Sequence, residues 1–153
     1  MRPRPLLLIL TGFLLCLALV SGQAGAVDYV GLRVSLPLGG LPPLVGAEVG
    51  MRLSPGWWSA SVLVSWDGRT LMVGSVDVVL GEPAAWGEAA FRLSVGLSYL
   101  ELGAGLPAPF AGAGIAYTVR PFEAVRVRAA AEVLYPVAFG PPLISLGGGW
   151  SLK

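Results

Sequence analysis

The feature that most constrains the fold of this chain is a stretch of nearly unbroken alternation between residues 88 and 101. Every second position carries an apolar side chain: Ala89, Phe91, Leu93, Val95, Leu97 and Tyr99. The positions between them are small or polar: Ala90, Arg92, Ser94, Gly96 and Ser98. A period of two predicts a β-strand with one apolar and one polar face. The run exceeds the usual strand of about five or six residues. It is long enough to cross a bilayer at a tilt, which takes about 9–11 residues.

Seven further runs of the same kind follow residue 27, separated by Gly- and Pro-rich turn signals. The eight runs are residues 28–36, 44–53, 57–66, 69–80, 88–101, 110–119, 122–135 and 142–152. Asp67-Gly68 is a strong hairpin signal, and Arg120-Pro121 is interpreted as a short turn. An even number of strands with short connections predicts an all-β fold, an eight-stranded antiparallel up-and-down transmembrane β-barrel.

The charged side chains of these runs fall almost entirely on the face opposite the apolar one. This set comprises Arg33, Glu48, Arg52, Asp77, Arg92, Arg126, Arg128 and Glu132. An Arg that faced lipid at the bilayer midplane would cost about 2–4 kcal/mol. The interior of an eight-stranded barrel is just wide enough for side chains to fill. The sequence therefore predicts an ion-pair network that plugs the lumen, with Gly and Ser leaving room for the long Arg side chains.

Aromatic residues near the ends of the apolar faces predict the two interfaces of a bilayer. They are Trp58, Trp66, Phe91, Tyr99, Tyr117, Tyr135 and Trp150. Trp58 and Trp66 lie eight residues apart, roughly 26 Å along a strand. A tilt of about 40° reduces this to about 20 Å, close to the apolar band of a membrane barrel. The alternative is that these aromatics belong to the core of an ordinary β-sandwich.

Residues 1–26 are predicted to be a cleaved signal peptide. Arg2 and Arg4 precede an apolar run over residues 6–20, and residues 24–26 (AGA) resemble a cleavage site. A retained N-terminal anchor helix is the alternative. The only cysteine, Cys16, lies inside this segment in a context unlike that of a lipoprotein anchor. The mature chain, residues 27–153, is thus expected to have no disulfide or thiolate metal site.

The C-terminus is similar to the assembly signal of outer-membrane barrels, with Ser145, Gly147, Trp150 and Leu152 in the four signal positions. Lys153 departs from that pattern, because such chains usually stop at the aromatic or hydrophobic residue. Together with the eight amphipathic runs, this makes residues 27–153 resemble the small eight-stranded OmpA/OmpX-type barrels. The resemblance implies insertion by the barrel-assembly machinery into bacterial outer-membrane lipid, with both termini in the periplasm. The connections at 54–56, 81–87 and 120–121 would be periplasmic, and those at 37–43, 67–68, 102–109 and 136–141 would face outward.

Several chemistries are missing from the sequence. The chain has no histidine, so a Ser–His–Asp arrangement is impossible. Its net charge of +1 gives no sign of nucleic-acid binding. Glu48 and Asp77 could act as an acid–base pair, but pairing with lumen arginines is the preferred interpretation. Long apolar windows past residue 26 contain Pro and Gly, which disfavours spanning helices.

Three functional hypotheses remain. The first is a non-catalytic, monomeric outer-membrane barrel with a structural or surface-interaction role, no cofactor and no metal. The second is a narrow channel or transport component. The third is a secreted lipocalin-like barrel, which would have an apolar interior and a polar exterior.

Overall fold

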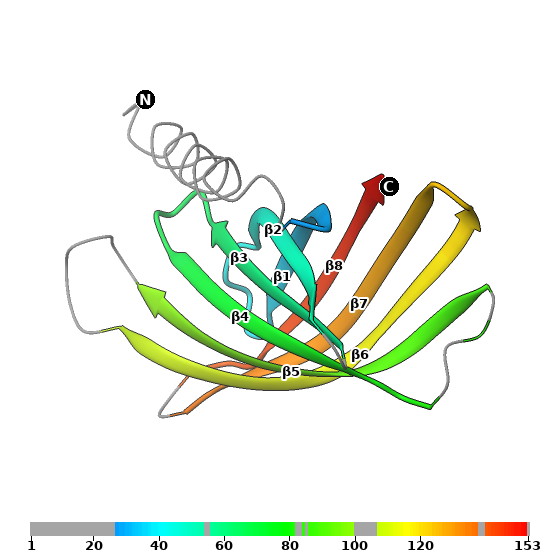
Figure 1. Ribbon diagram of the computed structural model, residues 1–153. Coiled ribbons are helices and arrows are strands. Elements are labelled where there is room, and N and C mark those ends of the chain that lie inside the picture. The colour runs from blue at the N-terminus through cyan, green and yellow to red at the C-terminus, as the bar shows by residue number, and fades with distance from the viewer. Residues whose placement is uncertain are drawn as a thin grey trace.

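The computed structural model describes residues 27–53, 56–81, 84, 86–99, 107–137 and 140–152, and within them eight β-strands. The strands are β1 (Tyr29–Pro37), β2 (Leu44–Leu53), β3 (Gly56–Val64), β4 (Thr70–Val79), β5 (Gly87–Tyr99), β6 (Ala108–Phe122), β7 (Val125–Pro136) and β8 (Leu143–Leu152). Each strand pairs antiparallel with the next along the chain, and β8 pairs with β1 to close a barrel (Figure 1). The predicted all-β, eight-stranded up-and-down barrel is confirmed.

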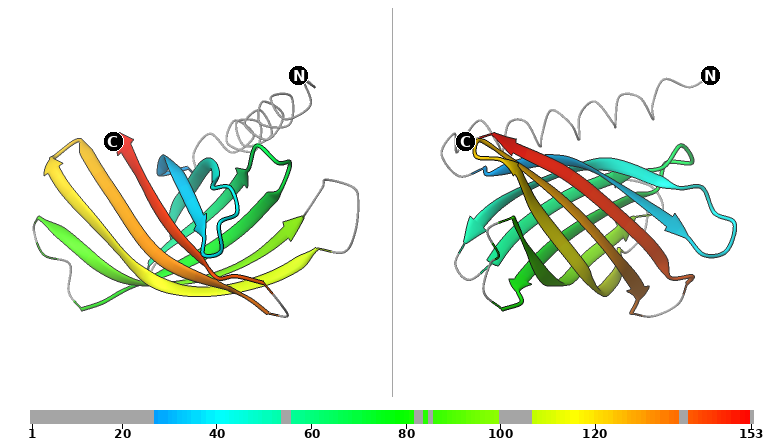
Figure 2. Two further views of the ribbon diagram at one scale, coloured as in Figure 1. Left: turned by 180° about the vertical axis from the view of Figure 1, so that it is seen from behind. Right: turned by 90° about the vertical axis from the view of Figure 1, so that its right-hand side faces the viewer.

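The strands run obliquely around the barrel axis (Figure 2). One continuous row of paired residues runs once around it: Tyr29, Gly50, Ser59, Ser75, Ser94, Gly112, Leu134, Leu143 and Pro37. The row leaves β1 at residue 29 and returns to it at residue 37, a shift of eight residues. Eight strands with this shift are tilted by about 36°, a geometry that side chains fill completely.

The two ends of the barrel differ in their connections. The first residues of β1 and the last of β8 lie at one end, here called the terminal end, where Val30 is paired with Trp150. The β2–β3, β4–β5 and β6–β7 connections lie at that end as well. The other four connections lie at the opposite end, here called the loop end.

The structure corrects one predicted turn. The chain does not turn at Arg120-Pro121, because β6 continues to Phe122 and the turn is formed by residues 123–124. The register shifts between Val119 and Phe122, so Pro121 lies in an interruption of the ladder. Proline is tolerated there because no ladder hydrogen bond needs its missing N–H.

The two faces of the sheet have opposite chemistry. Large apolar side chains are exposed on the outer face of every strand, among them Val30, Val45, Trp58, Met72, Phe91, Ile115, Val127 and Ile144. The buried interior instead contains most of the strand charges and many serines. Within the described residues, no helix has both the length and the apolar character needed to span a membrane.

Candidate functional site in the barrel interior

The centre of the interior is an ion-pair network, here called the ionic layer, built from three arginines and three carboxylates. Its members are Arg33, Glu48, Asp77, Arg92, Arg128 and Glu132, none of which is more than 4% exposed. They come from β1, β2, β4, β5 and β7, and all six belong to the charged set predicted from the sequence. Because the positive and negative charges are equal in number, the layer has no net charge when all six are ionised.

Asp77 accepts more hydrogen bonds than the other two carboxylates of the ionic layer. Its two oxygens accept hydrogen bonds from Nε and Nη2 of Arg92, at 2.7 and 3.1 Å. It also pairs with Arg128. Arg92 in turn donates to Glu48 at 3.0 Å, so one guanidinium links two carboxylates.

Arg33 holds the other side of the ionic layer. It pairs with Glu132, and one of its terminal nitrogens lies 3.8 Å from Glu48. That nitrogen, Nη1, donates to the hydroxyl of Ser61 at 3.0 Å, and Nε donates to the hydroxyl of Ser145 at 2.7 Å. The short serine side chains thus leave the space that the arginine occupies and also satisfy its N–H groups.

The remaining predicted lumen charges lie nearer the terminal end. Arg52 is partly exposed and pairs with Glu88 at 3.1 Å. Arg126 is half-buried and forms no ion pair with any residue of the described ranges, so it stands apart from the ionic layer. The eight predicted lumen charges therefore do not form one network, because six of them make up the ionic layer and two lie outside it.

Three further residues fill the interior at this end, Glu88, Tyr29 and Trp57, of which Glu88 and Trp57 were missed by sequence reasoning. The Trp57 indole N–H donates to Glu88 at 2.6 Å, and Arg128 lies over the Trp57 ring at 5.1 Å from its centroid. Tyr29 packs edge-on against Trp57 and donates to Glu48. Glu88 and Arg92 are an even number of positions apart in one strand, so their side chains share a face, and this spacing could have placed Glu88 in the interior.

A layer of aliphatic side chains, here called the leucine layer, fills the interior toward the loop end. It consists of Leu44, Leu63, Leu71, Val73, Leu134 and Leu143. Every one is at most 5% exposed. Sequence reasoning predicted an ion-pair network surrounded by Gly and Ser, whereas the structure also has a second, apolar seal. Leu63, Val73 and Leu143 occupy inward-facing positions in the alternation of their strands, and the apolar layer could have been inferred from them.

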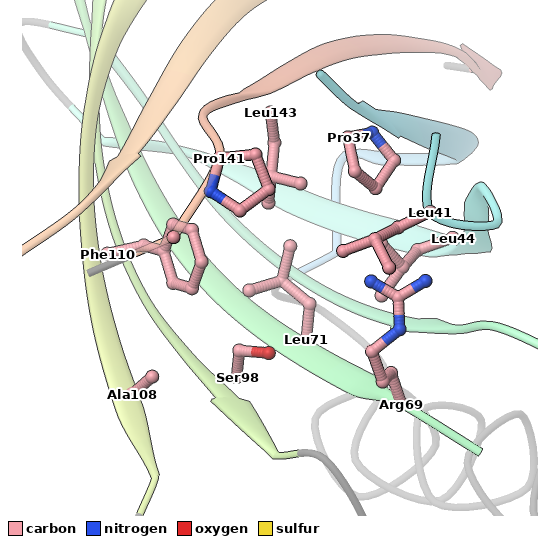
Figure 3. A pocket seen from close by; sticks show the side chains of 11 residues that line it. Pro37, Leu41, Leu44, Arg69, Leu71, Ser98, Ala108, Phe110, Pro141 and Leu143 are labelled. Atoms are coloured by element: carbon pink, nitrogen blue, oxygen red, sulfur yellow. The ribbon is translucent and has the colours of Figure 1, made fainter. Parts of the chain in front are cut away.

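Above the leucine layer the loop end opens into a small cavity of about 190 Å³ (Figure 3). Its wall is mainly apolar and includes Leu41, Leu71 and Phe110. Arg69 lies at its edge, where Nε donates to Asp67 at 2.8 Å. Burial acts to raise the pKa of the Asp67 carboxyl, but hydrogen bonds from Arg69 outweigh it and hold that pKa below its usual range.

Six of the seven predicted interface aromatics are exposed: Trp58, Trp66, Phe91, Tyr117, Tyr135 and Trp150. Trp66 lies in the turn after β3, which ends at Val64, rather than in a strand as predicted, and the side chain of Tyr99 lies outside the described residues. Trp86 and Phe122 were not predicted and are also exposed at the terminal end. Trp86 packs against Tyr117, with 5.9 Å between ring centroids.

The predicted assembly-signal residues occupy β8. Ser145 faces inward and accepts hydrogen bonds from Arg33 and Ser35. A Cβ added at Gly147 would lie 3.0 Å from a Glu48 oxygen, so glycine leaves room for that carboxylate. Trp150 faces outward. The side chain of Leu152, residue 153 and the predicted signal peptide lie outside the described residues.

Glu48 and Asp77, the two carboxylates that could form an acid–base pair, are both paired with arginines. Both oxygens of Asp77 accept hydrogen bonds from Arg92, whereas Oε2 of Glu48 accepts none from the described residues and lies 3.8 Å from Nη1 of Arg33. Among the described residues, no group of three His, Cys, Asp or Glu side chains could hold a metal ion.

Comparisons with known proteins show that the fold is shared with small outer-membrane barrels. No protein-family model matches the sequence, and no curated protein matches it. The N-terminal β-barrel domain of Pseudomonas aeruginosa OprF aligns with a TM-score of 0.54 at 14% identity, over 82% of this chain and 98% of that domain. Neisserial surface protein A (NspA) aligns with a TM-score of 0.55 at 12% identity, over 83% of this chain and 95% of the other. The predicted resemblance to small eight-stranded barrels is thus confirmed at the level of fold.

Proposed function

We propose that this chain is a non-catalytic outer-membrane β-barrel with a structural or surface-interaction role and a closed lumen. One observation carries the proposal: the barrel buries its charges and exposes its large apolar side chains. A barrel in water would have to do the reverse, because exposed apolar area costs free energy and buried charge costs more. In a bilayer the same arrangement is the favourable one.

Closure of the lumen is supported by two layers of different chemistry. The ionic layer fills the middle of the barrel with paired, buried charges, and the leucine layer fills the interior toward the loop end. An ion or small solute would have to displace both. This favours the closed barrel over the channel hypothesis, although short Ser and Gly side chains line part of the interior.

The lipocalin-like hypothesis does not fit the structure. It requires an apolar interior and a polar exterior, whereas Arg33, Asp77 and Arg92 are buried and Leu32, Val95 and Ile115 are exposed. A barrel shape alone is compatible with a lipocalin-like protein, but the placement of charged side chains inside and apolar side chains outside is not.

We infer a route of biogenesis from the two ends of the chain. Residues 1–26 act as a cleaved signal peptide, and Ser145, Gly147, Trp150 and Leu152 act as the signal read by the barrel-assembly machinery. The terminal end then faces the periplasm and the loop end faces outward. The aromatic side chains at both ends lie in the two headgroup regions.

Two measurements test the proposal in sequence. The first compares gel mobility of the refolded protein before and after boiling, and a closed membrane barrel is expected to shift its apparent size only when heated. The second measures conductance in planar bilayers, where no discrete openings are expected. Solubility in plain buffer without a heat-dependent shift would contradict the membrane assignment, and regular openings would contradict the closed lumen.

A further inference from the structure

The cavity at the loop end has an apolar floor and an open mouth. Leu44, Leu71 and Leu143 of the leucine layer form part of its wall and separate it from the ionic layer below. Its volume of about 190 Å³ exceeds the roughly 150 Å³ of a leucine-lined cavity that stays dry and takes up benzene. The space therefore suits one aromatic ring or the end of a short hydrocarbon chain.

Two hydrogen-bond donors lie at the edge of this apolar space. Arg69 uses Nε for Asp67 and Nη2 for the carbonyl of Pro42, at 2.8 and 2.9 Å. This leaves its Nη1 group without a bond to the described residues. Ser98 directs its hydroxyl into the space beside Leu71 and Arg69 (Figure 3). A ligand in the cavity could accept from both groups.

The charge at the mouth decides between a neutral and an anionic ligand. Asp67 pairs with Arg69 and so cancels its charge. A ligand carboxylate would therefore gain little net attraction from Arg69 and would lose its hydration on entering an apolar wall. A neutral carbonyl oxygen accepts the same hydrogen bonds and has less hydration to lose.

We propose that the cavity is a binding site for small, neutral, mainly hydrocarbon molecules that carry one carbonyl acceptor. The hydrocarbon part packs against the leucine layer and Phe110, and the carbonyl oxygen accepts from Arg69 and Ser98. This site requires a folded barrel but does not depend on whether the lumen conducts. Failure of the binding test and failure of the conductance test are therefore distinguishable.

The test uses acetophenone as the neutral probe and benzoate as its anionic counterpart, since both carry one ring and both dissolve in water. Amide NMR shifts of the isotope-labelled protein in lipid nanodiscs report binding at Leu44, Leu71 and Leu143. Acetophenone is expected to produce saturable shifts at these residues in the low millimolar range, and benzoate is expected to bind at least threefold more weakly.

Two variants examine the cavity itself. Ser98→Leu fills it and removes the hydroxyl, so acetophenone is expected to bind at least tenfold more weakly. The matched enlargement Ala113→Leu lies on the outer face of β6 and should leave binding unchanged. Arg69→Met keeps the hydrocarbon stem of the side chain, removes its hydrogen-bond donors and leaves the buried layers unaltered. It is expected to weaken acetophenone binding three- to tenfold, and it tests the site even if Ser98→Leu fails to fold. Shifts confined to outward-facing residues, equal binding by Ser98→Leu and Ala113→Leu, or tighter binding of benzoate would each overturn the proposal.

Discussion

Asp77→Asn is the sharpest test of the ionic layer, because it removes one charge and almost no volume. Asp77 is fully buried and pairs with two arginines. After the substitution, Arg92 still has Glu48 at 3.0 Å. Arg128 loses its only ion pair among the described residues and keeps a hydrogen bond to the hydroxyl of Thr118 at 2.7 Å and its position over the Trp57 ring, neither of which supplies a full negative charge. Removing one partner of a buried ion pair costs about 3–5 kcal/mol, since the other charge is left uncompensated.

The converse substitution, Arg128→Met, should cost less. Asp77 would keep both hydrogen bonds from Arg92, so no buried charge is left without a partner. The expected loss is that of one charged hydrogen bond, about 1.5–3 kcal/mol. In the double variant the unpaired arginine is absent. Its total cost should therefore fall below the sum of the single costs by roughly 0.5–3 kcal/mol.

The assay is urea unfolding of the barrel in lipid vesicles, with the folded fraction followed by gel mobility without boiling. Glu88→Gln, near the terminal end, is a useful comparison, because its partner Arg52 is partly exposed and can be solvated after the change. The reasoning is refuted if Asp77→Asn lowers the free energy of unfolding by less than about 1 kcal/mol, the size of an exposed pair. Strict additivity of the two substitutions would refute it as well.

Five further substitutions test the outer face, the glycines and the leucine layer. Leu93→Arg, in the middle of β5, should cost about 2–4 kcal/mol of unfolding free energy in vesicles. Leu53→Arg, at a strand end, should cost at most about 1 kcal/mol, although the two leucines are 49% and 47% exposed. Equal costs of the two substitutions would argue against a lipid-facing surface. Gly46→Ala should impair refolding yield, because its Cβ would clash with the carbonyl oxygen of Val62, whereas Gly74→Ala meets nothing within 4 Å and should stabilise by about 0.5–1 kcal/mol. Leu71→Ala should cost about 2–5 kcal/mol by leaving a cavity and still show no openings in planar bilayers, since the ionic layer remains intact.

The fold could be predicted because one rule governs every strand. Alternation assigns each side chain to lipid or interior, and a membrane makes an error in that assignment expensive. Arg33, Glu48 and Asp77 therefore lie inside as expected. The end of β6 was mispredicted since Arg120-Pro121 has the composition of a turn, and an irregular register is not visible in composition.

The partners inside the barrel could not be predicted in the same way. Arg33 of β1 pairs with Glu132 of β7, which lies two strands away across the closure between β8 and β1. Such a contact depends on the shift of eight residues around the barrel, and no single strand encodes that shift. Glu88 was missed for a similar reason. It is the second residue of β5, and its partners Arg52 and Trp57 lie on β2 and β3, so the spacing within β5 could give its face but not its contacts.

The tilt of the strands also explains why the interior has layers that no one strand displays. The row of paired residues that begins at Tyr29 passes Ser59, Ser75 and Ser94 and then reaches Leu134 and Leu143 before it closes on β1. The row thus runs from the aromatic residues of the terminal end, past the serines beside the ionic layer, to the leucine layer. Each strand contributes only a few residues to each layer. The separation of charged from apolar side chains therefore depends on the register between strands. A charged layer that is internally neutral needs no counterion from solvent, and a hydrocarbon layer above it excludes the water that could compete for its hydrogen bonds. The two layers are therefore expected to stabilise each other, with the leucine layer keeping the ionic layer dry on the side that faces the cavity.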